Sequence, residues 1–230
     1  MSNSSDVAAK YSIGYAIFNW GTLADTYPAI IAGYNEAFRT LGIEPFTEEK
    51  IKHLTRVEPD KNILFETAFG KHKEQAREIF YKYIIEHHLD NLSLFPGAND
   101  VLKFCENNNI KCYLISGKTN TSEKPFLRDE VKKLGLETCF EKILGAGEAE
   151  RDVPSELAMY ALFDDDLPDP EETVVVGKGK IDYLVAKECF STPTPIIICN
   201  PEGIYTSPRP NYMITNLSEV IEIFKREFSL

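Results

Sequence analysis

The sequence predicts an α/β protein with a doubly wound parallel sheet and an inserted all-helical domain. Short apolar runs of strand length recur along the chain and end in small or polar residues, as buried parallel strands do. Helical patterns separate most of these runs, which is the arrangement of successive βαβ units. One long segment, by contrast, has helical patterns and no strand-like run. These three observations indicate a sheet with helices on both faces and a helical insertion.

Six runs are expected to form the sheet: Tyr15–Phe18, Lys111–Ile115, Lys142–Leu144, Thr173–Val176, Thr194–Cys199 and Tyr212–Ile214. Five helical patterns lie among them or follow the last: Ala98–Asn107, Phe126–Leu134, Ser155–Phe163, Asp182–Cys189 and Leu217–Phe228. In a sheet of this class, ligands bind outside the carboxyl ends of the strands. We therefore expect function in the loops 19–26, 116–121, 145–154 and 177–182.

Residues 26–94 are predicted to form the helical domain, and residues 1–25 and 95–230 the α/β core. Four helical patterns fill the insertion: Pro28–Leu41, Thr47–Thr55, Lys61–Phe69 and Lys73–His88. Thr47 supplies an N-cap and is followed by two acidic residues in the first turn. Pro96-Gly97 marks the return to the core.

Composition and charge exclude several classes of function. A hydrophobic fraction of 43% and a charged fraction of 27% are ordinary for a soluble globular protein. The net charge of −11 argues against a nucleic-acid or anionic-membrane partner bound over a broad surface. No apolar run of about 18 residues and no signal-peptide pattern occurs. The five cysteines include no Cys-x-x-Cys pair, so we expect reduced thiols in a cytoplasmic protein.

The most informative stretch is Phe18–Leu23 (F-N-W-G-T-L), which runs from the end of the first predicted strand into the first of the four loops. It resembles the first motif of the haloacid dehalogenase (HAD) superfamily of phosphatases, F-D-x-D-G-T-L, with both aspartates replaced. The resemblance extends from about residue 13 to 228 and is strongest to the phosphoglycolate phosphatase-like branch, whose helical cap follows the first motif. Leu23–Thr26, Phe95–Gly97 with Val101-Leu102, and Tyr212–Glu219 resemble other motifs of that branch.

The resemblance implies a defined chemistry, from which this sequence departs. In the superfamily, the first aspartate attacks phosphorus and the second, two residues later, protonates the leaving group. Alignment on Gly21-Thr22 places Phe18 at the nucleophile and Trp20 at the acid. Alignment on the strand, with one residue deleted, places Asn19 at the nucleophile instead. Neither phenylalanine nor a neutral carboxamide can replace an aspartate nucleophile.

The other motifs survive in part. The second reads Ser116-Gly117-Lys118, the third has Arg151 where the family has lysine, and the fourth has Lys178 in place of an acid but keeps Asp182. Active relatives are expected to use Mg²⁺ held by clustered carboxylates, whereas here one candidate acid faces several cations. We therefore expect no metal cofactor. The side chain of Lys178 is predicted to occupy the place of the metal.

Two functions follow as hypotheses. The first is a non-catalytic member that binds a small phosphorylated ligand or a protein partner. Its expected anion-binding residues are Thr22, Ser116, Gly117, Lys118, Arg151 and Lys178. The second is an active phosphoester hydrolase with relocated chemistry, using Asp25 or Asp182 as the acid.

Two further alternatives stay open. In one, Lys178 pairs with Asp182 and Trp20 fills the former pocket, which would remove anion binding. In the other, the chain is a structural subunit with an exposed apolar patch at Ile196–Cys199 or Phe228–Leu230.

Overall fold

The computed structural model describes residues 12–57, 61–119, 121, 124–148, 155–190, 195–199 and 209–228. The chain divides into two compact units. The core unit comprises Met1–Leu23, Phe95–Arg128 and Gly135–Leu230, and the helical unit comprises Ala24–Leu94 and Asp129–Leu134. Relative to the predicted boundaries, the helical unit additionally takes Ala24, Asp25 and Asp129–Leu134.

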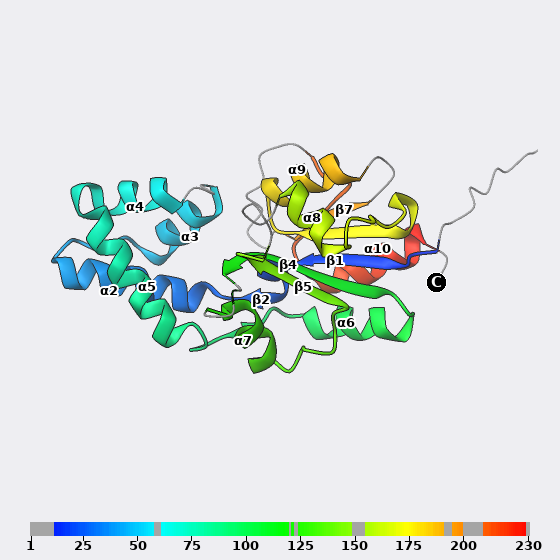
Figure 1. Ribbon diagram of the computed structural model, residues 1–230, viewed down its shortest axis with the longest axis horizontal. Helices are drawn as coiled ribbons and strands as arrows, with labels where there is room; N and C mark the ends of the chain where they lie inside the picture. Colours follow the sequence, from blue (N-terminus) through cyan, green and yellow to red (C-terminus); the bar gives the residue numbers. More distant parts are fainter. Residues whose placement is uncertain are drawn as a thin grey trace, which may run out of the picture. The chain divides into compact units, whose positions relative to one another are not determined.

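The core unit is built on a six-stranded parallel sheet in the order β5-β4-β1-β6-β7-β8 (Figure 1). Its strands are β1 (Tyr15–Asn19), β4 (Lys111–Thr119), β5 (Lys142–Ala146), β6 (Thr173–Gly177), β7 (Ile196–Cys199) and β8 (Tyr212–Ile214). The helices are α1 (Trp20–Leu23), α6 (Ala98–Asn107), α7 (Phe126–Lys133, which continues into the helical unit), α8 (Glu156–Leu162), α9 (Lys180–Cys189) and α10 (Ser218–Glu227), with the 3₁₀ turn η2 (Pro170–Glu172) before β6. The predicted α/β class is confirmed.

Helices cover both faces of this sheet because the strands are apolar on both faces. Figure 1 shows α8 and α9 on one face and α6 and α10 on the other. On the first face, Met159 and Leu162 of α8 and Val185 of α9 pack on Ile17 of β1. On the second, the rings of Phe104 and Phe224 lie 6.2 Å apart and join α6 to α10.

The helical unit contains α2 (Tyr27–Leu41), α3 (Glu48–Val57), α4 (Lys61–Phe69), the 3₁₀ turn η1 (Gly70–His72) and α5 (Lys73–His87). Aromatic side chains make its interior: the ring of Tyr34 stacks on those of Phe65 and Phe69, with centroids 5.5 and 6.0 Å away. The segment predicted to lack strands has one short exception. β2 (Ala24–Asp25) and β3 (Ser93–Leu94) pair antiparallel where the chain enters and leaves the unit.

Three sequence expectations need correction. β4 does not end at Ile115 but continues to Thr119, with a register shift against β5. Ile196–Cys199, considered as an exposed patch, is buried and forms the whole of β7. Phe228 is also buried, at 3% exposure, whereas Ser229 and Leu230 lie outside the described residues.

The outer edge of β5 is covered by charged side chains. The guanidinium of Arg128 donates to the carbonyl of Ile143 at 3.4 Å and to Glu148 at 2.8 Å. Glu148 in turn accepts the backbone N–H of Gly145 at 2.8 Å. Two backbone groups of this edge strand, the Ile143 carbonyl and the Gly145 N–H, therefore have side-chain partners in place of another strand.

Candidate functional site

The candidate site lies at the carboxyl edge of the sheet, where β1 and β6 end side by side. Phe18 of β1 pairs with Val176 of β6, so Asn19 and Gly177 are the next residues on the two strands. The chain then turns into α1 after Asn19 and into α9 after Gly179. Two segments about 160 residues apart in the sequence thus present side chains to one another, as parallel strands of a doubly wound sheet require.

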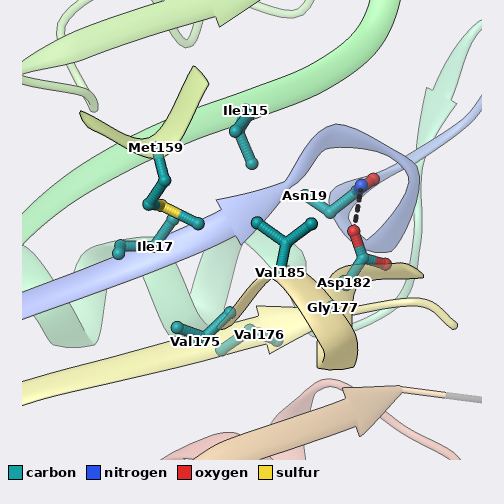
Figure 2. A pocket seen from close by; sticks show the side chains of 9 residues that line it. All are labelled: Ile17, Asn19, Ile115, Met159, Val175, Val176, Gly177, Asp182 and Val185. Carbon is teal, nitrogen blue, oxygen red and sulfur yellow. Dashed lines mark hydrogen bonds between the residues drawn. The ribbon is translucent and has the colours of Figure 1, made fainter. Parts of the chain in front are cut away.

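Asn19 is fixed by hydrogen bonds on both ends of its carboxamide (Figure 2). Its Nδ2 donates to Oδ1 of Asp182 at 2.7 Å, and its Oδ1 accepts the backbone N–H of Gly21 at 2.8 Å. The amide orientation follows from these partners, since reversing it would place oxygen against carboxylate and N–H against N–H. Thr22 adds a third link, because its hydroxyl donates to the Asn19 carbonyl at 2.6 Å.

Asp182 is a buried carboxylate with three N–H donors. Besides the Asn19 amide, the backbone N–H groups of Lys178 and Gly179 donate to its Oδ2 at 2.7 and 3.1 Å. N–H groups at the start of a helix have no partner in a preceding helical turn, so Asp182 caps its own helix by accepting them. Burial raises the pKa of Asp182, although the three hydrogen bonds and the charge of Lys178 act in the opposite direction.

Gly177 allows the strand and the helix to approach each other this closely. The position of Gly177 in the motif does not by itself identify it as a site residue. A Cβ at Gly177 would lie 2.4 Å from the Cβ of Asp182, which is shorter than any ordinary contact. The strand can therefore approach the first turn of α9 only with glycine there. The signal in the sequence was the Gly-Lys-Gly stretch that ends an apolar run.

Lys178 lies across the turn that begins α1. A Cβ at Gly21 would be 3.3 Å from Cδ and 3.5 Å from Nζ of Lys178, and 3.3 Å from Oδ1 of Asn19. The ammonium group is thus near the Asn19 carboxamide. One side of the site is cationic at the position where the resemblance implies a metal ligand.

Ser116, Gly117 and Lys118 lie in the irregular end of β4, which is the neighbour of β1 on the other side. Ser116 is 6% exposed, and its Oγ accepts the backbone N–H of Lys118 at 3.1 Å. Its hydroxyl proton remains able to donate. These residues follow Ile115, which pairs with Asn19, so they lie at the same edge of the sheet as Asn19.

Three other predicted site residues contribute to the fold of the protein. Phe18 is fully buried within β1, and Trp20 is 1% exposed, so neither side chain is presented to solvent. Asp25 belongs to the helical unit, where its Oδ1 accepts the N–H of Tyr27 at 3.0 Å at the start of α2. Arg151 lies outside the described residues.

A small cavity of about 10 Å³ has Asn19 and Asp182 in its lining (Figure 2). Its lining is mostly aliphatic and comprises Ile17, Asn19, Ile115, Met159, Val175, Val176, Gly177, Asp182 and Val185. Trp20 is not among these residues. A space of this size holds at most one water molecule, so substrate cannot enter between the sheet and α8–α9.

The described residues do not fit a Mg²⁺ site. Mg²⁺ requires oxygen ligands in near-octahedral geometry, and carboxylates supply them in proteins. Both oxygens of Asp182 already accept N–H donors, and the nitrogen of Asn19, which has no lone pair to offer, is directed at the carboxylate. Among the residues that the structure describes, no group of three or more acidic, histidine or cysteine side chains could hold a metal.

Comparison with known proteins identifies the family. The family model for haloacid dehalogenase-like hydrolases matches residues 20–190, and the chain therefore belongs to this family. A phosphoglycolate phosphatase of Vibrio vulnificus is 24% identical over 218 residues, covering 88% of this chain and 92% of the relative. This similarity supports the phosphoglycolate phosphatase-like branch.

Solved structures agree with the fold. A haloacid dehalogenase-like hydrolase of Streptococcus pneumoniae superposes with a TM-score of 0.74 at 21% identity, covering 92% of this chain and 98% of the other. YfnB of Bacillus subtilis, solved bound to magnesium, gives a TM-score of 0.67 at 16% identity and covers 93% of this chain and 99% of the other. No helix among the described residues is both long and apolar enough to cross a membrane.

Proposed function

We propose that this chain is a HAD phosphatase-like protein that binds a phosphate-like anion at the carboxyl edge of its sheet without hydrolysing it. The observation that carries this proposal is the Asn19 carboxamide at the end of β1, with its nitrogen hydrogen-bonded to Asp182. A neutral amide held by donors and acceptors on both ends is a poor nucleophile. No aspartyl-phosphate can form at this position.

The same edge offers groups that attract an anion. Lys178 extends over the α1 turn, and the Ser116 hydroxyl and Lys118 come from the neighbouring strand. Opposite them, the charge of Asp182 is already compensated by three N–H donors. A dianionic phosphate would thus meet ammonium groups without requiring a bridging cation.

A phosphoester hydrolase is the second candidate, and the comparisons favour it more directly than loss of activity. The relative from Vibrio vulnificus is a phosphoglycolate phosphatase, and the matched family consists of hydrolases. The raised pKa of Asp182 would suit a general acid. Its two occupied oxygens argue against this role, as does the use of Asp25 to begin α2.

A protein partner is the other ligand class compatible with a non-catalytic role. Leu157 of α8 and Ile181 and Leu184 of α9 are about 40% exposed, which leaves apolar surface on this pair of packed helices. Of the two patches considered from the sequence, Ile196–Cys199 is buried, and in the other Phe228 is buried while Ser229 and Leu230 lie outside the described residues.

Two measurements on the purified protein separate these functions. Inorganic phosphate is titrated by calorimetry into the wild type, Lys178→Met and the matched control Lys187→Met, which changes an exposed lysine of α9, the helix that follows Lys178. We expect binding that weakens roughly 10-fold in Lys178→Met only, as loss of one charge-assisted contact predicts. No phosphate binding by the wild type would overturn the anion proposal and direct the search to protein partners.

Phosphatase activity is measured in parallel with an aryl phosphate and small phosphate esters in the presence of Mg²⁺. We expect no turnover above that of Asp182→Asn. Turnover in the wild type that is lost in Asp182→Asn would instead establish the hydrolase.

A further inference from the structure

We propose that the Asn19–Asp182 hydrogen bond replaces a divalent cation as the link between β1 and α9, so that this site assembles without metal. The proposal concerns how the core unit is held together. It holds whether or not an anion binds, and its test does not use a phosphate ligand.

The Asn19–Asp182 contact meets the needs of a buried carboxylate. A carboxylate buried at 9% exposure needs positive charge or donors close by. In a metal site a cation fills this need and joins the carboxylate to a second acidic residue. Here an amide hydrogen of Asn19 fills it at 2.7 Å between Nδ2 and Oδ1, and the partner strand contributes no negative charge.

The orientation of the Asn19 carboxamide is fixed by its two hydrogen bonds. A cation could use only its Oδ1, which accepts the N–H of Gly21 at 2.8 Å. Turning the amide toward a cation would break that bond and the bond to Asp182 together. The observed orientation therefore directs the amide nitrogen, which cannot bind a cation, at the carboxylate.

The charge around the Asn19–Asp182 contact is positive on one side. The Lys178 side chain approaches the turn at Gly21 and brings its ammonium near the carboxamide. The remaining oxygen of Asp182 is occupied by the backbone N–H groups of Lys178 and Gly179. A divalent cation entering here would be repelled by the Lys178 ammonium and would compete with three N–H donors for the oxygens of Asp182.

The test compares thermal unfolding in EDTA and in Mg²⁺ for the wild type, Asn19→Asp and Asn19→Ala. The wild type should unfold at the same temperature in both. Asn19→Asp places a second carboxylate against Asp182, so it should be less stable in EDTA and regain roughly 5 °C or more when Mg²⁺ is about 100-fold above its Kd. Asn19→Ala removes the donor without adding charge and should be destabilised equally in both solutions.

Binding of Mn²⁺, followed by the electron paramagnetic resonance signal of the free ion, gives an independent readout. We expect no site in the wild type and one in Asn19→Asp that Mg²⁺ displaces. Wild-type binding that disappears in Asp182→Asn would overturn the proposal, as would an Asn19→Asp protein whose stability ignores Mg²⁺. Should Asn19→Asp fail to fold, the wild-type and Asp182→Asn measurements still decide.

Discussion

Removal of the Asp182 carboxylate should destabilise the core unit far more than removal of a similar carboxylate at the surface. Asp182→Ala leaves three N–H donors without their acceptor, from Asn19, Lys178 and Gly179. Each buried donor left unpaired costs roughly 1–3 kcal/mol, and loss of the buried charge returns part of this. We expect a net loss of about 3–5 kcal/mol, or roughly 10 °C in Tm for a chain of this size.

The matched control is Glu219→Ala. Glu219 also caps its own helix, accepting the N–H groups of Thr215 and Asn216 at 3.1 and 3.0 Å, but it is exposed. Its removal should cost about 1 kcal/mol. Urea unfolding followed by circular dichroism measures both variants. Equal losses in the two would refute the argument that burial makes the Asp182 contacts important.

Three other predictions follow. Gly177→Ala should cost about 1–3 kcal/mol in urea unfolding because its Cβ would be 2.4 Å from that of Asp182, whereas Gly179→Ala, with no atom within 4 Å of its Cβ, should change little. The raised pKa of Asp182 means that the folded state keeps this proton to higher pH than the unfolded state, so its ionisation should remove stability as pH rises from about 4. Asp182→Asn should flatten that slope above about pH 4, and an unchanged slope would contradict the assignment. Burial raises the pKa of Tyr34 to about 12, so alkaline absorbance titration should lose one late-ionising phenol in Tyr34→Phe, and loss of an ordinary tyrosine near pH 10 would contradict it.

Much of the sheet could be predicted because parallel strands buried on both faces are continuous apolar runs. Tyr212–Ile214 has the predicted bounds, and β6 differs from its prediction only by Gly177. The end of β4 could not be predicted, since Ser116-Gly117-Lys118 has the composition of a loop. The neighbouring strand β5 pairs irregularly with the end of this segment, a tertiary effect that local sequence does not encode.

The site shows a similar limit. Two alignments of the first motif left Phe18 and Asn19 as alternatives for one position, and their side chains alternate between opposite faces of a strand. Only the structure shows that Phe18 is fully buried and that Asn19 ends the strand beside Asp182. The partner of Asn19 lies 163 residues away, and its identification required the order of strands as well as their existence.

The charged covering of β5 has a consequence for the chain in a crowded solution. An edge strand with open backbone groups is a template on which another molecule can add a strand and begin aggregation. A strand arriving at β5 would have to displace Arg128 from the Ile143 carbonyl and Glu148 from the Gly145 N–H. Growth of the sheet from one molecule to the next is therefore opposed at this edge by two side chains that take no part in the candidate site.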